Sequence, residues 1–441
     1  MAGIFKAYDI RGIYPAELDE EIIEKIGKAA ATLHGKNIVV GSDVRKTSPG
    51  LKSSLIKGLI SSGAHVTDIG NITTPMMIFA TANYGFDLGM VVTASHNPPQ
   101  YNGVKIFGKG GFPLSYERGL DRIEKLVKEN KFLTGNGTLE QKNIYDDYKK
   151  FLLKNLKIKT ASLKIVVDCF NGSDSLIAPE ILSSLGATVV RLRCGFNGDF
   201  PEAGPDPSHK GNLDPLSQKV LEEKADIGLA FDGDGDRLAV VDSKGNLVDT
   251  KIVFSFLAEN IPEGSKVVHD VLTSNTVIDS IKKNKSTPIA CRVGHTYITQ
   301  KILQEKAALG GELSGHFYFS ETFGGDDALF AGLKVLETIS AKNTSLEEYC
   351  SNYPKSHSDS MRVLIKEQEK LGFIEKIKND FSLTHKTDTL DGVKIFFNNG
   401  WAVFRPSNTE PKISVAYESS DKAEFLKIKN LVDDVISKIP Q

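Results

Sequence analysis

The sequence predicts an α/β fold in which several α/β units are followed by a smaller α+β unit. Two patterns predict this fold. Through most of the chain, short runs of β-branched residues alternate with stretches whose apolar residues recur at helical spacing. Towards the C-terminus, neighbouring strand patterns flanked by helices replace this alternation. At 441 residues, the chain is also too long for a single hydrophobic core.

The first unit shows the alternation most clearly. Apolar residues recur every three or four positions over residues 18–33 and predict a helix, which Gly35 can end. The expected order that follows is strand, helix, strand, helix and strand, over residues 37–43, 51–63, 64–70, 73–85 and 88–95. This order predicts a mostly parallel sheet with helices on both faces.

Similar orders recur after a polar break at residues 134–138. The second unit has expected strands at 163–172, at 187–194 and on both sides of 231–237, with a helix at 174–185. The third has strands at 265–274, 287–293 and 311–319, and helices at 276–282, 299–307 and 327–341. A break at 351–360 precedes the α+β unit, with strands at 360–367, 391–399, 401–407 and 412–420 and helices at 371–381 and 422–439.

Composition and charge exclude several classes of protein. Lys and Arg number 54 against 56 Asp and Glu, so no basic excess indicates nucleic acid or an anionic membrane as a partner. No apolar stretch approaches the roughly 20 residues that span a bilayer, and the N-terminal segment becomes polar too early for a signal peptide. Cys169, Cys194, Cys291 and Cys350 stand far apart without a CxxC motif, which indicates buried thiols in a reducing compartment. We expect a cytoplasmic monomer.

The segment FDGDGDR, residues 231–237, is the strongest chemical signal in the chain. Its carboxylates, Asp232, Asp234 and Asp236, repel one another strongly if they converge, so a cation is then needed among them. The glycines between them let the backbone curl, and hard oxygen ligands favour Mg²⁺. An EF-hand is excluded, because the loop glycine and the final glutamate are missing. A solvated acidic turn is the alternative.

The segment TASHNP, residues 93–98, predicts a stiff, exposed turn at the end of a buried strand. Pro98 and Pro99 bar helix and central strand, so the turn presents Ser95 where the strand ends. A serine that caps backbone groups is the alternative, and a hydrolase nucleophile elbow is not supported, because GxSxG is absent. His96 is no evidence for a catalytic base, since neighbouring side chains on a strand point to opposite sides.

Two further segments carry candidate ligand-binding groups. In GELSGH, Glu312 and Ser314 lie on one side of an extended chain, where a carboxylate and a hydroxyl suit the hydroxyls of a sugar. In FRPSNTEP, a guanidinium and short donors in a turn suit a phosphate, and these groups belong to Arg405, Ser407, Asn408 and Thr409. Each segment taken alone is equally compatible with an ordinary turn.

Taken together and in order, the segments YDIRG, TASHNP, NGVKIF, FDGDGDR, GELSGH and RPSNTEP resemble the motifs of the α-D-phosphohexomutase superfamily. The stretch GELSGHFYF most resembles the phosphomannomutase/phosphoglucomutase branch. The resemblance implies three related α/β domains with mixed sheets and a C-terminal α+β domain around a central cleft. They would carry the phosphoserine, metal-binding, sugar-recognition and phosphate-binding loops in that order, at residues 1–142, 143–248, 249–355 and 356–441.

The resemblance also implies a role for each candidate residue. Ser95 matches a serine that carries a phosphoryl group and supplies one metal ligand, and Asp232, Asp234 and Asp236 match the other Mg²⁺ ligands. The further catalytic positions are matched by Arg11, Lys105 and His295. The substrate-binding positions are matched by Tyr8, Arg237, Arg292, Glu312, Ser314, His316, Arg405, Ser407, Asn408 and Thr409.

The activity implied by the resemblance is the interconversion of hexose 1-phosphates and 6-phosphates, of mannose and of glucose. It would use Mg²⁺, and glucose 1,6-bisphosphate or mannose 1,6-bisphosphate as activator and intermediate. A fixed phosphoserine suits this task, because a direct transfer between O1 and O6 of one sugar is geometrically unfavourable. We expect the fourth domain to close over the sugar phosphate, with residues 351–360 as the hinge.

Alternatives remain open at the level of the sequence. They are a phosphoglucosamine mutase, a sugar-phosphate-binding protein without catalysis and a serine-dependent phosphatase. Two positions depart from the pattern of the family. Leu272 stands where relatives often have a basic residue, and Gly325 stands where an aromatic residue is frequent. Either departure can alter phosphate affinity or sugar preference.

Overall fold

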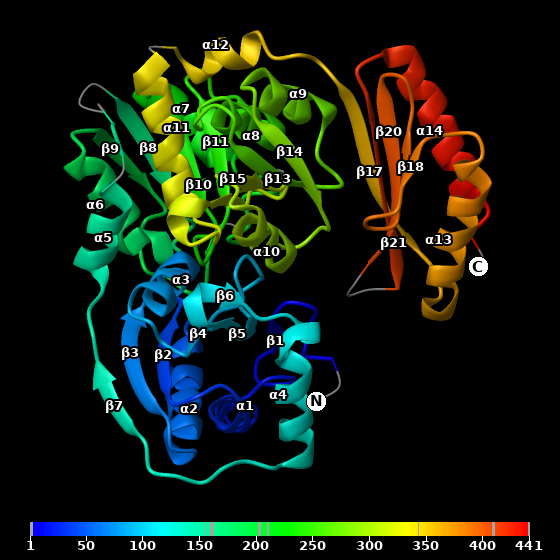
Figure 1. Cartoon of the computed structure of the whole chain (residues 1–441). Coiled ribbons are helices and arrows are strands. Elements are labelled where there is room, and N and C mark those ends of the chain that lie inside the picture. Colours follow the sequence, from blue (N-terminus) through cyan, green and yellow to red (C-terminus); the bar gives the residue numbers. More distant parts are fainter. Residues whose placement is uncertain are drawn as a thin grey trace.

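The computed structural model describes residues 3–154, 156–158, 163–201, 204–209, 211–342, 344–407 and 411–439. This part of the chain forms four sheets that follow one another along the sequence (Figure 1). The first three are mixed and flanked by helices, and the last is antiparallel, so the predicted fold class is confirmed. Among the described residues, no helix combines the length and the apolar character that crossing a membrane requires.

The first sheet carries the serine turn. Its order is β1-β5-β4-β2-β3-β7, with β6 paired to β5. The bounds are β1 (Ile10–Ile13), β2 (Asn37–Ser42), β3 (His65–Asn71), β4 (Leu88–Val92), β5 (Tyr101–Gly108), β6 (Phe112–Pro113) and β7 (Thr138–Gln141). Strand β5 is antiparallel to both β1 and β4, whereas β2, β3, β4 and β7 are parallel. The short turn after β4 forces this reversal, because a parallel pair needs a longer crossover.

Four helices pack with the first sheet: α1 (Glu20–Leu33), α2 (Ser48–Ser61), α3 (Thr74–Asn83) and α4 (Leu120–Glu129). The first three were predicted. Helix α1 begins at Glu20 rather than at residue 18, because the Asp19 side chain caps it and accepts the Ile22 amide hydrogen bond at 2.8 Å. The sequence analysis missed α4.

The second and third sheets repeat one pattern, three parallel strands followed by an antiparallel strand. The second, ordered β12-β11-β10-β8-β9, contains β8 (Lys164–Asp168), β9 (Thr188–Leu192), β10 (Ile227–Phe231), β11 (Leu238–Asp242) and β12 (Leu247–Val248). The third, ordered β14-β13-β15-β16, contains β13 (Lys266–Asp270), β14 (Thr287–Cys291), β15 (Leu309–Gly311) and β16 (Phe317–Phe319).

The helices of these two units are α5 (Tyr145–Leu153), α6 (Ala178–Ser184), α7 (Asp214–Glu223), α8 (Thr250–Ala258), α9 (Asn275–Lys283), α10 (His295–Glu305), α11 (Ala328–Lys342) and α12 (Leu346–Ser351). The sequence analysis missed α5, α7, α8 and α12. It also placed the start of α10 at residue 299, whereas the helix begins at His295, directly after Gly294.

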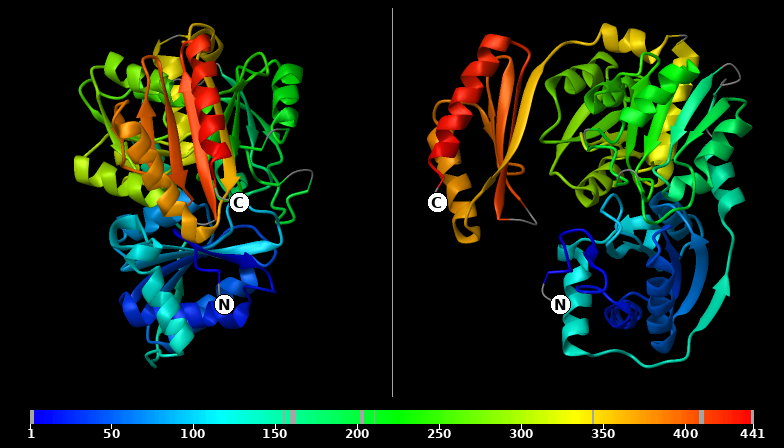
Figure 2. Two further views of the ribbon diagram at one scale, coloured as in Figure 1. Left: turned by 90° about the vertical axis from the view of Figure 1, so that its right-hand side faces the viewer. Right: turned by 180° about the vertical axis from the view of Figure 1, so that it is seen from behind.

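The fourth sheet is antiparallel throughout and has the order β17-β21-β20-β19-β18. Its elements are β17 (His357–Leu364), α13 (Glu367–Ser382), β18 (Thr387–Asp388), β19 (Val393–Phe396), β20 (Gly400–Pro406), β21 (Lys412–Ser419) and α14 (Lys422–Ser437). Both helices cover its outer face, and the sheet lies beside the third unit (Figures 1 and 2). The predicted break at 351–360 is too long, because β17 begins at His357 and pairs with β21.

The hydrophobic cores show which units belong together. One core joins side chains of the first three units, for example Met77 of α3, Phe231 of β10 and Phe317 of β16. The fourth unit has its own core, and only a small buried cluster of Val271, Trp401 and Val403 links it to the third. The four cysteines are free thiols, as expected, and the Sγ atoms of Cys169 and Cys194 lie 3.3 Å apart although the two residues are distant in the sequence.

Candidate active site

Ser95 lies in a tight turn that begins where β4 ends. Thr93 Oγ1 accepts the hydrogen bond of the Ser95 amide at 2.9 Å, and Ser95 adopts a left-handed conformation with φ of 52°. Such a conformation is uncommon for residues other than glycine. The turn is not exposed as predicted: Ser95 is only 3% exposed. The loop 231–237 packs on it so closely that a Cβ atom on Gly233 would lie 2.5 Å from the Ser95 carbonyl oxygen.

His96 contacts Ser95, contrary to the sequence analysis. The Ser95 Oγ atom lies 3.1 Å from His96 Nδ1. The argument from strand geometry was wrong here, because β4 stops at Val92 and the turn brings consecutive side chains together. Burial, followed by the charges of Arg237 and Arg11, lowers the pKa of His96 to about 3. The imidazole is therefore neutral near pH 7 and can accept a hydrogen bond from the serine.

Asp232 organises the loop that faces the serine. Its Oδ2 atom lies 3.0 Å from Ser95 Oγ. Its Oδ1 atom accepts backbone hydrogen bonds from Gly235, Asp236 and Arg237 at 3.1, 3.0 and 3.1 Å. The loop is thus wound around its first carboxylate, and Gly235 allows the turn with φ of 80°.

The three loop carboxylates converge as the sequence predicts. An oxygen of Asp232, one of Asp234 and one of Asp236 all lie within 4.8 Å of one another. Burial, followed by the charges of Asp236 and Asp234, raises the pKa of Asp232 well above its usual range. Asp234 Oδ1 is buried without a hydrogen-bond partner. Buried carboxylate oxygens that repel one another and keep a free ligand atom fit a divalent cation such as Mg²⁺.

Strand β5 places Lys105 against the same carboxylates. Its Nζ atom donates to Asp234 Oδ2 at 2.7 Å and to Asp236 Oδ2 at 2.5 Å. Burial disfavours its charge, but the two carboxylates outweigh burial and hold the pKa of Lys105 well above its usual range. Burial likewise opposes the charge of Asp236, yet Lys105 and His316 hold its pKa well below its usual range.

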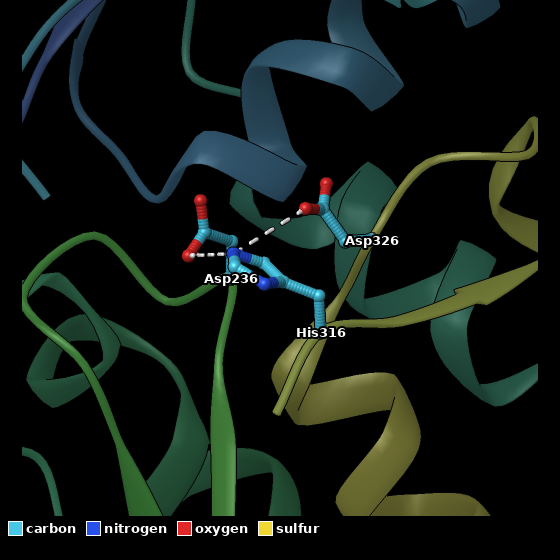
Figure 3. A group of neighbouring side chains, drawn as sticks. All are labelled: Asp236, His316 and Asp326. Carbon is cyan, nitrogen blue, oxygen red and sulfur yellow. Dashed lines mark ion pairs between the residues drawn. The ribbon is translucent and has the colours of Figure 1, made fainter. Parts of the chain in front are cut away.

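His316 joins the metal loop to the third unit. Figure 3 shows its ring between Asp236 and Asp326. The Nε2 atom lies 3.4 Å from Asp236 Oδ1 and 3.9 Å from Asp326 Oδ2. Burial opposes protonation, but the Asp236 carboxylate outweighs it and raises the pKa of His316. Burial, then Asp236, raises the pKa of Asp326 to about 7. These residues are a second group with converging metal-ligand atoms.

Glu312 and Ser314 lie in the short loop between β15 and β16. Tyr318 donates its hydroxyl hydrogen to Glu312 Oε2 at 2.7 Å, and the amide of Gly294 donates to Oε1 at 3.2 Å. Ser314 Oγ lies 2.8 Å from His316 Nδ1. The carboxylate is therefore held in one orientation beside an exposed hydroxyl.

The first residue of α10, His295, lies against the N-terminal segment. Its ring contacts the ring of Tyr8 edge to face, with centroids 5.1 Å apart, and the Tyr8 hydroxyl donates to the Val293 carbonyl at 3.2 Å. Burial, followed by the charges of Lys105 and His316, lowers the pKa of His295 to about 4.

Two of the predicted arginines already have partners in the structure. Arg11 donates to Asn97 Oδ1 at 2.7 Å, within the serine turn, and to Asp9 Oδ2 at 2.5 Å. Arg292 lies over the ring of Tyr297, 4.4 Å from its centroid.

Arg405 belongs to the fourth unit, on β20. Its Nε atom donates to Asp391 Oδ2 at 2.7 Å, and the same oxygen accepts the Val293 amide hydrogen bond at 3.0 Å. This chain of contacts places Arg405 beside the third unit. Asn408 and Thr409 lie outside the described residues, so only Arg405 and Ser407 of this segment can be located.

A cavity of about 580 Å³ brings many of these residues together. The predicted residues that line it are Tyr8, Arg11, Ser95, Lys105, Asp236, Arg237, His295 and His316. A neighbouring cavity of about 430 Å³ is lined by Tyr8 and Arg292. Neither cavity is lined by Glu312, Ser314, Arg405 or Ser407. A larger cavity of about 710 Å³, near α9 and the fourth unit, contains none of the predicted residues.

The sequence analysis missed three residues of the cleft region: His96 and Arg362, which line the cavity, and Asp326, which also contacts His316. His96 is adjacent to the serine, and Asp326 directly follows Gly325, one of the two departures from the family pattern, so both had a weak signal. The sequence around Arg362, on β17, contained no signal of a functional role.

Comparison with known proteins shows what this architecture belongs to. The four family models of phosphoglucomutase/phosphomannomutase match the chain in order: alpha/beta/alpha domain I at residues 2–134, domain II at 146–245, domain III at 250–356 and the C-terminal domain at 361–435. The chain belongs to the phosphoglucomutase/phosphomannomutase family. It is therefore a phosphotransferase of the mutase class.

Relatives and solved structures agree with this family. A phosphomannomutase from Methanocaldococcus jannaschii is 37% identical, with 97% of each chain covered. The phosphomannomutase/phosphoglucomutase of Pseudomonas aeruginosa is 34% identical over 98% of this chain and 94% of its own. A crystal structure of a phosphoglucomutase/phosphomannomutase family protein from Burkholderia thailandensis has a TM-score of 0.91 at 30% identity, with 98% of this chain and 96% of that chain covered.

More distant members of the fold have been solved with ligands. The N-acetylphosphoglucosamine mutase of Aspergillus fumigatus, in complex with GlcNAc-6P and magnesium, has a TM-score of 0.59 at 16% identity. The alignment covers 98% of this chain and 96% of that chain. At this identity the likeness shows a shared fold.

The two departures from the usual pattern of the phosphoglucomutase/phosphomannomutase family have structural counterparts. A Cβ atom on Gly325 would lie 2.8 Å from the Ile78 side chain, so a larger residue here would require that side chain to shift. Leu272 packs against the apolar cluster of Val271, Trp401 and Val403 that links the third and fourth units. A basic residue there would face an apolar contact.

Proposed function

We propose that this chain interconverts the 1-phosphates and 6-phosphates of mannose and glucose by means of a phosphoryl group carried on Ser95. The observation that carries the proposal is the position of Ser95 Oγ, 3.0 Å from Asp232 in a loop of converging carboxylates, beside a cleft lined by basic side chains. A protein that only binds sugar phosphates needs neither the serine nor the carboxylate loop.

The reaction needs a fixed donor because O1 and O6 lie at opposite ends of the sugar. In the proposed cycle, the bond between phosphorus and Ser95 Oγ breaks while a bond forms to the free hydroxyl of the substrate, whose proton is released. The resulting 1,6-bisphosphate reorients, and its other phosphate returns to Ser95. The left-handed turn and its close packing against Gly233 support the rigidity that such a donor requires.

Charge compensation is the second requirement, because phosphoserine carries about −1.5 to −2 charges at neutral pH. Lys105 supplies a buried ammonium group between Asp234 and Asp236, and Arg11 and Arg237 line the same cleft. When bound by Ser95 and the three aspartates, Mg²⁺ would neutralise their charge and polarise the phosphoryl oxygens.

Two neutral imidazoles can handle the proton of the reacting hydroxyl. His96 touches Ser95 Oγ, and His295 lies in the cleft close enough to Lys105 for that charge to lower its pKa. Because burial and neighbouring positive charges keep the pKa of each ring at about 3 to 4, both are neutral at pH 7 and have a nitrogen lone pair available for this proton. We assign the catalytic position to His295, since His96 contacts the atom that carries the phosphate.

Recognition of the sugar is assigned to the loop of Glu312 and Ser314. Tyr318 and Gly294 hold the carboxylate, which supports a fixed acceptor for sugar hydroxyls. Arg405 and Ser407 of the fourth unit are proposed to bind the phosphate that is not transferred. These groups do not line the cavity of the structure, so the proposal includes closure of the fourth unit.

The test is a coupled isomerase assay with glucose 1,6-bisphosphate as activator and three substrates in parallel. We expect specificity constants for mannose 1-phosphate and glucose 1-phosphate within about two orders of magnitude, because the sugars differ only at O2 and a small steric difference supplies about 1–3 kcal/mol. A strong preference for glucosamine 1-phosphate would identify a phosphoglucosamine mutase instead. Release of free phosphate in excess of isomer would identify a phosphatase.

A further inference from the structure

Arg45 is an arginine with a nearly inaccessible side chain, and it lies beneath the serine turn. Arg45 is 1% exposed, and it lies in the segment between β2 and α2. We propose that Arg45 is a positioning residue for phosphoryl transfer, which holds the turn of Ser95 in place through the carbonyl oxygens of that turn. The inference rests on the proposed role of Ser95 as phosphoryl carrier.

The guanidinium group binds four carbonyl oxygens of one short segment. Nη2 donates to the carbonyls of Ser95 and Asn97 at 2.7 and 2.6 Å. Nη1 donates to the carbonyls of Pro98 and Tyr101 at 2.8 and 3.1 Å. A single side chain therefore fixes the beginning, the middle and the end of the turn.

The fifth donor anchors the guanidinium to the sheet. Arg45 Nε donates to Asp43 Oδ2 at 3.1 Å, and Ser48 donates its hydroxyl hydrogen to Asp43 Oδ1 at 2.5 Å. The Asp43 amide in turn donates to the carbonyl of Val92, the last residue of β4, at 2.9 Å. The turn is thus tied to the C-terminal ends of β2 and β4.

Only arginine fits this arrangement. A guanidinium has five N–H donors in a planar fork, and all five are used here, whereas a lysine has three donors on a compact head. Loss of the fork would remove hydrogen bonds from the buried carbonyl oxygens of Ser95 and Asn97, at a cost for each group, whereas the Pro98 carbonyl would keep the Tyr101 amide at 3.0 Å. Arg45 does not line the cleft, so its effect on the substrate can only be indirect.

The second unit closes the other side of the guanidinium. The ring centroid of Phe200 lies 4.9 Å from the Arg45 guanidinium carbon. Gly198 packs so tightly that a Cβ atom there would lie 2.5 Å from the Arg45 Cα atom. Arg45 and Gly233 of the metal loop both pack against the Ser95 carbonyl oxygen. The distance from Ser95 Oγ to the carboxylates depends on both supports.

This geometry predicts a specific kinetic effect. A displacement of the donor by about 1 Å can reduce the rate of transfer by about 100-fold, because the reacting atoms leave their near-attack positions. Substrate binding uses other residues, so KM should stay within about twofold. A residue needed only for folding would reduce the amount of active protein without changing the rate per phosphorylated molecule.

The experiment compares wild type, Arg45→Lys, Arg45→Ala, Phe200→Leu and the control Lys46→Ala. Lys46 is the next residue and also carries a positive charge. Its side chain is exposed and forms an ion pair with Asp199, and among the described residues it makes no hydrogen bond to the turn. Each protein is phosphorylated with labelled glucose 1,6-bisphosphate and mixed rapidly with glucose 1-phosphate. The loss of label from Ser95, the KM and the melting temperature are measured.

We expect Arg45→Lys to transfer its phosphate about 100-fold more slowly with an unchanged KM. Transfer in Phe200→Leu should be slower by about threefold to tenfold. The control Lys46→Ala should transfer phosphate at the wild-type rate. Guanidinium ions at concentrations below those that unfold the protein should partly restore transfer in Arg45→Ala, and methylammonium should not. Wild-type transfer rates in folded Arg45→Lys would overturn the inference. If the Arg45 variants do not fold, a wild-type rate in Phe200→Leu would overturn it.

The outcomes separate this inference from the proposed function. Absence of label on wild-type Ser95 would contradict the phosphoserine itself. Labelled wild-type protein together with unaffected transfer in the variants would contradict the role of Arg45 and leave the phosphoserine in place.

Discussion

At the scale of single residues, the two carboxylate oxygens of Asp234 have different surroundings. Its Oδ2 atom accepts from Lys105 Nζ at 2.7 Å and from the hydroxyl of Thr74 at 2.6 Å. Its Oδ1 atom is buried without a hydrogen-bond partner. One oxygen thus belongs to the permanent ammonium group, and the other is left for a metal ion.

The first prediction concerns this free oxygen. Asp234→Asn should weaken Mg²⁺ binding by at least about 10-fold, the loss that even outer-shell partners produce, and should lower turnover correspondingly. Isothermal titration of the unphosphorylated protein with Mg²⁺ measures the affinity independently of activity. Glu222→Gln, an exposed carboxylate change on α7, is the control. Equal Mg²⁺ affinity in Asp234→Asn and wild type would remove Asp234 from the metal site.

The residues of this site differ in how far the sequence could predict them. The alternation of Asp232, Asp234 and Asp236 with glycine predicts that the three carboxylates converge, because their convergence depends only on the local backbone. The carboxylates do converge in the structure. The contact between His96 and Ser95 depends on one positive φ angle, which no pattern of residue types specifies. Arg45 was missed for a similar reason, because its partners are backbone carbonyls.

At the scale of elements, β13 carries the buried histidine His269 one residue before its end. The side chain is 6% exposed, and its Nδ1 atom lies 2.9 Å from the carbonyl oxygen of Asp270. Burial lowers the pKa of His269 from 6.5 to about 4, more than the Asp270 carbonyl raises it. Between these two pH values, the unfolded chain binds more protons at this position than the folded one. Stability is therefore complete above pH 6.5 and falls as the pH decreases towards 4.

The second prediction follows from this sign. The contribution of His269 makes the unfolding free energy of wild type increase between pH 4.5 and 7. The variant His269→Gln should lose up to about 3 kcal/mol of this increase. Urea unfolding of both proteins at a series of pH values measures the slope. The difference in slope carries the test, since His96 and His295 are present in both proteins and cancel. Parallel slopes would show that His269 titrates normally in the folded chain.

Elements were predictable where apolar residues form a clear helical stripe or a short continuous run. Helix α1 has such a stripe, strands β2 to β4 are short and largely buried runs, and all four were found within a few residues of their bounds. Helices α4 and α7 were missed although α4 buries Leu120, Ile123 and Val127 at helical spacing, so the pattern that predicts this helix is present in the sequence. The antiparallel direction of β5 follows from the short serine turn rather than from any residue in the strand.

At the scale of the whole molecule, the fourth unit is the part with a separate hydrophobic core. The first three units share a hydrophobic core, whereas the fourth meets the third through a few polar contacts and one small apolar cluster. Lys394 donates to the Val271 carbonyl at 2.7 Å, and Glu418 accepts from Ser274 Oγ at 2.9 Å. The chain between α12 and β17, residues 352–356, connects the two units (Figure 1). Within the predicted hinge, residues 351–360, this segment is the part that lies outside helices and strands.

The third prediction is closure of the fourth unit over the substrate. X-ray scattering should show a smaller radius of gyration in saturating glucose 1,6-bisphosphate, because Arg405 has to approach a ligand that also contacts Ser95. Arg405→Ala should lose this compaction and raise KM by about 10- to 100-fold, the value of a hydrogen bond to a charged group, while Ser95 still accepts phosphate. An unchanged radius of gyration in saturated wild type would contradict closure.

The order of the four units could be predicted from the sequence, because each contains one motif. The position of the fourth unit could not, since it depends on a few side-chain contacts such as Lys394 with Val271 and on Leu272 in the connecting cluster. These contacts have no periodicity, and similar residues occur on many surfaces.

The most direct measurement follows a labelled phosphate through one turnover. Wild-type protein is incubated with labelled glucose 1,6-bisphosphate, mapped by mass spectrometry and then mixed with glucose 1-phosphate, with Ser95→Ala treated in parallel. The account predicts about one phosphate per wild-type chain, located on Ser95 and transferred to the sugar, and a loss of turnover of more than about 1000-fold in a folded Ser95→Ala. Isomerisation at the wild-type rate by Ser95→Ala, or turnover without label on Ser95, would contradict it.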